Sequence, residues 1–493
     1  MNIPKDKQFS EWFNSVVSEA ALADLRYNVK GFVVFRPWSV KTMKLMYAAY
    51  EAELEARGHQ PALFPALIPE SNFKIEGEHV EGFTPQVFWV SEAGGNRLEE
   101  KLAMRPTSET AMYQMYSLWI QGLADLPMKI YQSCQVWRYE TKATKPFIRS
   151  REFHWIEAHD CFATETEARA QVREDMEMTE AVVHRQFGLP FVFFQRPEWD
   201  KFPGAIHTYA ADTLMPDGRV LQLPSTHLLG QNFSKAFNVT FQNEKGERDF
   251  VWQTCYGPAI SRIYGALFSV HGDDRGLVLP FDFAPVQVAI VPIIGKDKDG
   301  AAILAYGQKL ASALRAAGLR VQFDDRPQTP GFKYNHWELR GVPIRIEIGQ
   351  KETDEQTLTV VPRDCKPGKG PAEPGQPTKK LVPLSSAIDS IRSEGSALSK
   401  RLLQKADAYF HAHQSDASDM AALSAKLSEG GLVRVPFCSM SKQDGKPCAD
   451  EIKAKMAGDV RGIKYPAEPE PSSQNCIQCG KPATCWAYVA RQY

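Results

Sequence analysis

The amino-acid sequence predicts three successive domains: an α+β domain with antiparallel strands at residues 1–284, an α/β domain at 285–385, and a C-terminal α/β domain at 386–493. Three observations support this prediction. Two strand-like segments flank a loop rich in lysine and threonine in the first domain, strand and helix patterns alternate after Pro285, and five of the nine cysteines follow residue 437.

Composition limits the class of protein. With 493 residues and 43% hydrophobic content, the chain can build several cores. The 58 basic and 59 acidic residues nearly cancel, which excludes a protein that coats nucleic acid through bulk charge. The N-terminal segment lacks the pattern of a signal peptide, and no apolar run approaches the roughly 18 residues of a membrane span. We therefore expect a cytoplasmic protein without membrane attachment.

The first domain carries strong helix and strand signals. Apolar residues at helical spacing predict a helix over 39–55, with Ser39 as its N-cap and Gly58 as its stop. Thr164 and Glu167 fit a capping box at the start of a second long helix. β-Branched and aromatic residues on both sides of the basic loop predict two antiparallel strands.

The second domain shows regular alternation. Residues 286–294, 319–325 and 342–349 have strand patterns, whereas 301–317 and 332–341 have helix patterns. This alternation is typical of a small, mostly parallel α/β domain.

A candidate phosphate site is the segment Arg-Pro-Thr-Ser-Glu-Thr at 105–110 together with Arg138, Glu140, Arg149 and Arg151. Taken singly, these residues have structural explanations, such as a helix cap at Thr107 or Ser108 and solvated hairpin ends. Together, arginines at strand ends beside a basic loop suit a triphosphate, because the guanidinium binds phosphate oxygens in pairs.

The C-terminal cysteines have metal-ligand spacing. Cys438, Cys448, Cys476 and Cys479 form a C-x9-C…C-x2-C pattern, and four thiolates can complete a tetrahedral, structural zinc site. The first pair is widely spaced, so either a long loop folds back or the ligand set differs, with Cys485 as the spare candidate. A metal-free cluster is the alternative.

Longer motifs make the sequence resemble class II aminoacyl-tRNA synthetases, and among them the prolyl-tRNA synthetases of archaea and eukaryotes. Residues 58–69 resemble the first motif, a dimer-interface element around Pro65, while 135–159 and 255–267 resemble the second and third motifs. The stretches RPTSET, QLPSTHLLGQNFSKAF and HGDDRGLVLP resemble the prolyl branch. The resemblance extends along essentially the whole chain. It implies an antiparallel class II catalytic sheet with flanking helices, an anticodon-binding domain, a zinc-binding C-terminal domain and a homodimer.

The resemblance also implies roles for individual residues. Thr107, Ser108 and Glu109 would bind proline, with Thr107 and Glu109 on its ammonium group. The remaining proline-site residues would be Arg138, Trp155, Glu157, His159, Phe202 and His227. Those that hold ATP would be Arg138, Glu140, Arg149, Ser150, Gln222, Ser225 and Arg262.

The implied activity is that of a proline–tRNA ligase. L-Proline reacts with ATP, accompanied by Mg²⁺, to give prolyl-adenylate and pyrophosphate, and the prolyl group passes to the 3′ end of tRNA(Pro). Alignment and charge stabilisation by the catalytic residues Arg138 and Arg262 replace a protein nucleophile. Glu338, Arg340 and Lys351 are candidate anticodon contacts, with a solvated helix face as the alternative. The terminal Tyr493 would reach toward the active site.

Four positions depart from the family pattern: Cys255, Tyr256, Ser225 and Gln86. Neutral divergence explains them most simply, and the alternative is a second-copy enzyme whose cavity tolerates an inhibitor. An inhibitor panel would separate the two.

Other functions remain as alternatives. A paralogue that does not charge tRNA would often lack the anticodon domain, and a scaffold with a dead core would not need Thr107, Glu109, Arg138 and Arg262. Specificity for threonine would require a Cys/His zinc set in the core, and the sequence shows none by its spacing. The stretch from His159 to Cys255 is too short for a bacterial-type editing insertion, so we expect no cis editing.

Overall fold

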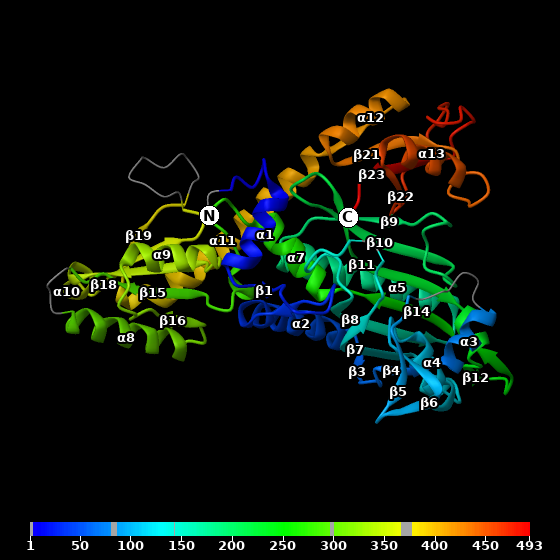
Figure 1. Ribbon diagram of the computed structural model, residues 1–493, viewed down its shortest axis with the longest axis horizontal. Helices are drawn as coiled ribbons and strands as arrows, with labels where there is room; N and C mark the ends of the chain where they lie inside the picture. The colour runs from blue at the N-terminus through cyan, green and yellow to red at the C-terminus, as the bar shows by residue number, and fades with distance from the viewer. Residues whose placement is uncertain (1–2, 80–85, 142, 296–299, 366–376) are drawn as a thin grey trace.

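The computed structural model describes residues 3–79, 86–141, 143–295, 300–365 and 377–493. Its centre is an eleven-stranded sheet in the order β20-β21-β23-β22-β9-β10-β11-β14-β8-β7-β3 (Figure 1). In chain order these strands are β3 (Gln60–Pro61), β7 (Met128–Trp137), β8 (Glu152–Phe162), β9 (Val192–Gln195), β10 (His207–Leu214), β11 (Val220–Gly230), β14 (Trp252–Gly257), β20 (Gln414–Asp416), β21 (Leu432–Phe437), β22 (Asp459–Lys464) and β23 (Cys485–Ala490).

The catalytic part of this sheet is antiparallel from β7 to β9, which confirms the predicted strand pair. Strand β7 pairs with β8 from Met128 opposite Cys161 to Trp137 opposite Glu152. Because side chains alternate along a strand, Ile156 and Ala158 of β8 enter the main core. That core is covered by helices α1 (Phe9–Glu19), α2 (Pro37–Ala56), α5 (Glu165–Thr179) and α7 (Ile260–His271).

Two helix signals had different outcomes. The capping box is confirmed, because Thr164 and Glu167 exchange backbone-to-side-chain hydrogen bonds of 2.9 and 3.3 Å at the start of α5. The predicted N-cap at Ser39 is wrong. Helix α2 begins at Pro37, and the Ser39 hydroxyl lies inside the helix, where it donates to the carbonyl of Leu22 at 2.8 Å.

Smaller elements cover the opposite face and the edges of the catalytic domain. They comprise α3 (Glu70–His79), α4 (Glu109–Trp119), α6 (Asn232–Ala236), β1 (Ala23–Asp24) with β2 (Val34–Phe35), β12 (Thr240–Gln242) with β13 (Arg248–Phe250), and the sheet of β4 (Leu67–Pro69), β6 (Asn96–Met104) and β5 (Trp89–Ala93).

The second domain has its own five-stranded sheet, which lies to one side of the catalytic sheet (Figure 1). Strands β16 (Val321–Phe323), β15 (Val288–Pro292) and β17 (Ile344–Ile348) are parallel, as predicted. The sheet is nevertheless mixed, because β18 (Thr357–Pro362) and β19 (Lys380–Pro383) add antiparallel pairs. Helices α8 (Ala301–Ala316), α9 (Pro330–Leu339) and α10 (Gln350–Asp354) accompany it.

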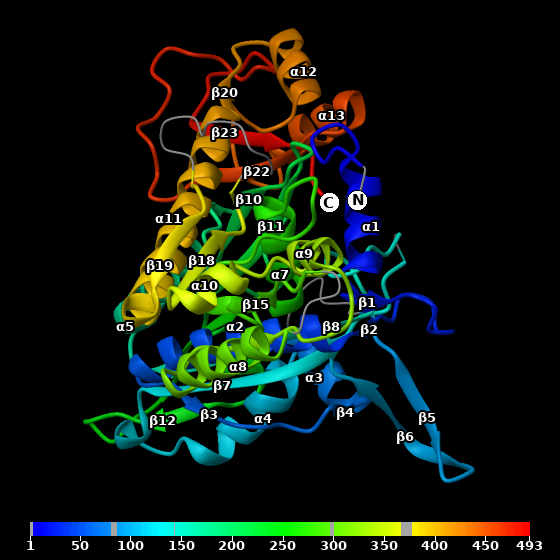
Figure 2. The ribbon, with the colours of Figure 1, turned by 90° about the vertical axis from the view of Figure 1, so that its left-hand side faces the viewer.

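The C-terminal domain is joined to the catalytic domain by backbone hydrogen bonding between strands. Strand β22 pairs with β9, so that Ile463 lies opposite Gln195 and Lys464 opposite Phe194. Helix α11 (Ala387–Ala412) runs from the second domain to this region (Figure 2). Helices α12 (Met420–Glu429) and α13 (Lys446–Met456) complete the domain. Among all described helices, none is long and apolar enough to cross a membrane.

Candidate active site and metal centre

A cavity of about 480 Å³ lies on the face of the catalytic sheet opposite the main core. The alternation of β8 places Trp155, Glu157 and His159 on this face. The predicted site residues that line it are Thr107, Glu109, Arg138, Glu140, Trp155, Glu157, His159, Phe202, Gln222, Ser225, His227 and Arg262. The structure thus brings together twelve side chains from six separate segments of the chain.

Glu157 organises the inner end of the cavity. Its carboxylate accepts hydrogen bonds from the Ser108 hydroxyl, from the Ser108 backbone N–H at 3.1 Å and from the Gln132 amide at 2.7 Å. His159 Nε2 lies 3.2 Å from the same carboxylate. Burial opposes ionisation, but these bonds and the charge of His159 outweigh it and hold the pKa of Glu157 below its ordinary value. Glu157 is therefore an anion.

Glu109 is the second carboxylate of this inner end. It begins α4 and is buried, with 2% of its surface exposed. The Thr107 hydroxyl donates to one of its oxygens, and the Cys255 thiol lies 3.7 Å from the other. Burial alone would lower the pKa of His159, but the bond to Glu157 and the charge of Glu109 raise it above the ordinary value. The raised pKa favours the imidazolium form of His159, whose charge offsets part of this negative charge.

One wall of the inner end is aromatic and uncharged. Phe202 and His227 have ring centroids 4.9 Å apart. Burial, followed by the charges of His159 and Arg196, lowers the pKa of His227 to about 3, so its imidazole is neutral. Its nitrogens lie 2.9 Å from the Thr208 hydroxyl and 3.1 Å from the Ser225 hydroxyl. This wall suits an apolar ring.

Two arginines give the other part of the cavity positive charge. Arg138 donates to the Pro106 carbonyl at 3.0 Å, and its guanidinium lies 5.5 Å from the Trp155 ring centroid. Arg262 donates to the Ile148 carbonyl at 3.1 Å. Burial, followed by repulsion from Arg138 and Arg149, lowers the pKa of Arg262 to about 10, so it remains cationic at neutral pH.

Three predicted residues do not line the cavity. Ser108 lies behind Glu157 and makes no side-chain cap for α4. The Ser150 hydroxyl donates to the Glu152 carbonyl at 2.6 Å. Arg149 is 3.8 Å from Glu140 and donates to the carbonyl oxygen of Tyr493 at 2.9 Å. The end of the chain thus contacts the loop of the second motif.

The sequence interpretation missed a buried charge cluster beside the cavity. Asp212 of β10 accepts hydrogen bonds from Arg196 at 2.6 Å and from Arg461 of β22 at 2.7 Å. The same Arg196 donates to the Gln222 amide oxygen at 3.1 Å. The two arginines outweigh burial and lower the pKa of Asp212 to about 2. No local motif marks this cluster, because strand pairing brings its members together.

The four positions that depart from the family pattern all border the cavity: Gln86, Ser225, Cys255 and Tyr256. The Tyr256 hydroxyl is nevertheless directed to the Thr179 hydroxyl at 2.8 Å. Cys255 is the position that adds a new functional group, a thiol next to Glu109.

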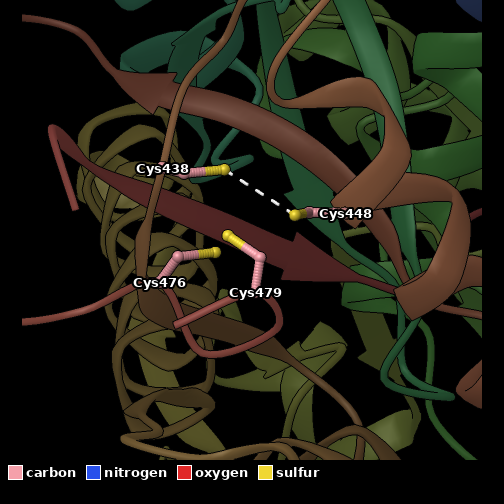
Figure 3. Close-up of side chains that lie close together, drawn as sticks. All are labelled: Cys438, Cys448, Cys476 and Cys479. Carbon is pink, nitrogen blue, oxygen red and sulfur yellow. Dashed lines mark hydrogen bonds between the residues drawn. The ribbon is translucent and has the colours of Figure 1, made fainter. Parts of the chain in front are cut away.

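The C-terminal cysteines converge in the structure. The sulfurs of Cys438, Cys448, Cys476 and Cys479 lie within 4.8 Å of one another and point toward a common centre (Figure 3). The Cys438 and Cys448 sulfurs are 3.7 Å apart. Tetrahedral Zn–S bonds of about 2.3 Å require sulfurs about 3.8 Å apart, so this set fits zinc.

The wide spacing of the first cysteine pair has a structural explanation. The chain between Cys438 and Cys448 turns back, with the Gly445 N–H donating to the Ser441 carbonyl at 3.0 Å, and Cys448 then lies in the first turn of α13. The spare candidate Cys485 is not in the cluster, because its sulfur is directed to the Phe437 carbonyl at 3.6 Å.

The candidate anticodon residues lie in different surroundings. The Glu338 carboxylate is 2.6 Å from Arg345 and 3.7 Å from Arg275 of the catalytic domain. Arg340 donates to the His336 ring at 3.0 Å, whereas Lys351 is exposed on α10. Glu338 therefore stabilises a contact between domains.

Comparison with known families divides the chain into three parts. Residues 88–271 match the tRNA synthetase class II core domain (G, H, P, S and T). Residues 287–394 match the anticodon binding domain, and residues 420–493 match the prolyl-tRNA synthetase C-terminal domain. These matches confirm the predicted fold classes.

Whole-chain relatives agree with this division. The proline–tRNA ligase of Thermofilum pendens is 50% identical over 100% of this chain and 99% of its own length, and that of Pyrococcus abyssi is 41% identical over 99% and 98%. The Giardia lamblia prolyl-tRNA synthetase in complex with prolyl-adenylate superposes with a TM-score of 0.93 at 36% identity, covering 100% of both chains. The Cryptosporidium parvum enzyme, complexed with halofuginone and AMPPNP, gives 0.91 at 32% identity and covers 100% of this chain and 99% of its own. The chain therefore belongs to the prolyl-tRNA synthetase family of class II aminoacyl-tRNA synthetases.

Proposed function

We propose that the cavity activates L-proline with ATP to form prolyl-adenylate and that the chain then transfers the prolyl group to tRNA(Pro). The observation that carries this proposal is the order of charge in the cavity. Two carboxylates, Glu109 and Glu157, occupy the inner end, and the cationic Arg138 and Arg262 follow. An amino acid bound with its ammonium inward directs its carboxylate toward the arginines and the nucleotide.

The inner end accounts for selection of proline. Glu109 and Thr107 accept the two N–H bonds of the secondary ammonium group. Trp155, Phe202 and neutral His227 surround the apolar ring, while Glu157 and His159, whose pKa is raised, set the charge balance. The complex of the Giardia lamblia relative with prolyl-adenylate supports this assignment.

The arginine end accounts for the chemistry. The proline carboxylate attacks the α-phosphorus, the bond to the β,γ-pyrophosphate breaks, and pyrophosphate leaves with the electron pair. Arg138 bridges the carboxylate and the α-phosphate, and Arg262 binds the γ-phosphate. The remaining nucleotide contacts are Glu140, Arg149, Ser150, Gln222 and Ser225. Magnesium bound with ATP would supply further positive charge. The terminal ribose of tRNA then attacks the adenylate carbonyl and releases AMP.

Substitution of Arg138 tests this assignment. Arg138→Ala should lower prolyl-adenylate formation by roughly 10²–10³-fold, because a preorganised cation is lost where charge develops. Its fold should persist, as judged by thermal unfolding. Arg26→Ala is the matched control, because Arg26 is exposed and, within the described part of the chain, forms an ion pair with Asp24 alone. Near-normal adenylate formation by Arg138→Ala would remove this residue from the centre of the site.

We further propose that Cys438, Cys448, Cys476 and Cys479 hold a structural Zn²⁺. With all four positions filled by thiolates, the ion would clamp the loops around β21 and α13 and would have no catalytic role. Cys479→Ser should reduce zinc content by one equivalent per chain and lower thermal stability. Cys485→Ser, a neighbouring thiol outside the cluster, should retain the wild-type zinc content. Equal zinc content in the two variants would contradict the assignment.

A homodimer is proposed from the exposed apolar surface at the first motif. Leu63 is 84% exposed and Leu118 is 65% exposed. The Phe64 and Trp119 rings, each adjacent to one of these leucines, have centroids 5.8 Å apart. Leu63→Asp should shift the protein toward monomer in analytical ultracentrifugation. Leu381→Asp is the control, since Leu381 is 55% exposed on the anticodon-binding domain. An unchanged mass for Leu63→Asp would place the interface elsewhere.

The remaining assignments follow from the same reaction. We propose that Lys351 faces the anticodon, together with the less exposed Arg340 and Glu338. Lys351→Ala should therefore weaken tRNA binding without affecting adenylate formation. A cytoplasmic location is proposed for this reaction. The chain is also proposed to lack cis editing, and deacylation of alanyl-tRNA by the purified protein would contradict this.

A further inference from the structure

Three side chains at the inner end of the cavity form a second cluster of potential metal ligands. Glu109, His159 and Cys255 are all buried, and each places a ligand atom within 4.8 Å of the other two. The sheet fixes two of them as neighbours, because Cys255 of β14 lies directly opposite His159 of β8 in the antiparallel register. No local motif marks this set, since its members are widely separated along the chain.

The spacing of the cluster matches a known coordination geometry. The Cys255 sulfur is 3.7 Å from Glu109 Oε1. Tetrahedral zinc with a Zn–S bond of about 2.3 Å and a Zn–O bond of about 2.1 Å places these two atoms about 3.6 Å apart. A thiolate, an imidazole and a carboxylate are together a donor set that favours zinc over magnesium.

The surroundings of His159 also suit a ligand. One ring nitrogen is 3.0 Å from the Tyr113 hydroxyl and the other is 3.2 Å from the Glu157 carboxylate. When one nitrogen binds a metal, the other keeps its partner, which fixes the orientation of the ring. Three protein ligands leave the fourth tetrahedral position open to the cavity.

We propose that Glu109, His159 and Cys255 bind a thiophilic divalent cation, with Zn²⁺ as the best fit, and that this cation excludes proline. Binding releases the thiol proton of Cys255 and a proton of His159 to solvent. The exclusion of proline rests on the proposed function, because it requires Glu109 to be the partner of the ammonium group. Zinc then acts as a reversible inhibitor of the amino-acid site.

Metal binding is measured first without substrates. After equilibrium dialysis against ZnCl₂, the wild-type protein should hold one equivalent per chain more than Cys255→Ser, which keeps the size of the side chain but removes the soft donor. Cys365→Ser, a thiol outside both clusters, should bind as much zinc as the wild type. Equal zinc content in wild type and Cys255→Ser, with both folded, would overturn the proposal.

Competition is measured in proline-dependent ATP–pyrophosphate exchange. Zinc should raise the apparent KM for proline in the wild type, and Cys255→Ser should require at least roughly 100 times more zinc for the same increase, because loss of a mere outer-shell partner already weakens a metal site up to about 100-fold. Excess Mg²⁺ should not reproduce the effect. If the Cys255-dependent equivalent binds but proline does not displace it, the metal site stands and the placement of the proline ammonium at Glu109 is wrong.

Discussion

The C-terminal domain and the anticodon-binding domain are attached to the catalytic domain in different ways. The C-terminal domain continues the catalytic sheet through the β22–β9 pair and inserts Arg461 beside Asp212, and both of these side chains are at most 2% exposed. The anticodon-binding domain keeps a separate sheet. Its ion pairs with the catalytic domain join Arg363 to Asp273, which are 1% and 30% exposed, and Glu338 to Arg275, which are 23% and 26% exposed.

This difference indicates different roles for the two attachments. The buried cluster reaches the cavity, because Arg196 bonds both Asp212 and Gln222, and Arg196 and Gln222 line it. A buried charge pair is costly to break from one side, whereas exposed pairs contribute little. The C-terminal domain therefore shares the catalytic sheet, whereas the anticodon-binding domain docks through a separate sheet and through ion pairs that each keep at least one partly exposed side chain.

The largest effect is expected from Arg461→Met. This change leaves Asp212 buried with one guanidinium instead of two, and breaking a buried pair costs about 3–5 kcal/mol. The apparent KM for ATP should also rise, because Asp212 is held less firmly without Arg461, and the contact of Arg196 with Asp212 and Gln222 loosens with it. Denaturant unfolding and pyrophosphate exchange measure the two effects.

Arg434→Met is the matched control within the same domain. Arg434 pairs with Asp416, whose side chain is 63% exposed, so its loss should cost less than about 1 kcal/mol. If the two variants are equally stable, the C-terminal domain is not fixed through Arg461.

A smaller effect is expected at the other attachment. Arg363 donates to both oxygens of Asp273, at 2.6 and 2.8 Å, and to the Glu338 carbonyl at 2.9 Å. Arg363→Ala should lower tRNA prolylation roughly tenfold, equivalent to about 1.4 kcal/mol, and leave adenylate formation nearly unchanged. Adenylate formation without tRNA is thus the internal control. A parallel loss of both activities would show that the two attachments act alike.

The smallest effect concerns helix α11, which connects the two domains. Its Asp407 lies 2.8 Å from His184, which is also 2.8 Å from Glu180. The bond to Glu180, and then that to Asp407, raises the pKa of His184 from 6.5 to about 9 despite partial burial. The stabilisation of the folded state by protonated His184 is complete below the pKa of His184 in the unfolded chain, 6.5. It is lost as pH rises through the pKa in the folded state, about 9. His184→Gln should therefore flatten the fall in Tm between about pH 6.5 and 9. If Tm depends on pH in the same way in His184→Gln and in the wild type, the contact of His184 with Glu180 and Asp407 is contradicted.

Local signals predicted much of the fold. The capping box at Thr164 and the alternating pattern of β8 needed only neighbouring residues, and both are present in the structure. Ser39 misled the prediction because Pro37 starts α2 and the serine bonds the distant Leu22. The pairing of β22 with β9 had no sequence signal, since strand partners far apart in the chain are chosen by tertiary packing.

The residues of the candidate site show the same contrast between local motifs, which could be recognised in the sequence, and partners that only strand pairing brings together. Residues within motifs, such as Thr107, Glu109 and Arg138, reached the cavity as predicted from the family resemblance. Arg196 and Asp212 were missed because each belongs to an ordinary strand pattern and acquires a partner only through the sheet. The cysteine spacing alone could not show that the chain turns back before Cys448.

The most direct test of the account is proline-dependent ATP–pyrophosphate exchange by the purified protein, with alanine, cysteine and threonine as competitors. The order of charge from Glu109 to Arg262 predicts strong exchange with proline and little with the other three. No exchange in a folded sample that holds zinc at the C-terminal cysteines but is free of excess zinc, or exchange driven by another amino acid, would contradict the assignment of this cavity to proline activation.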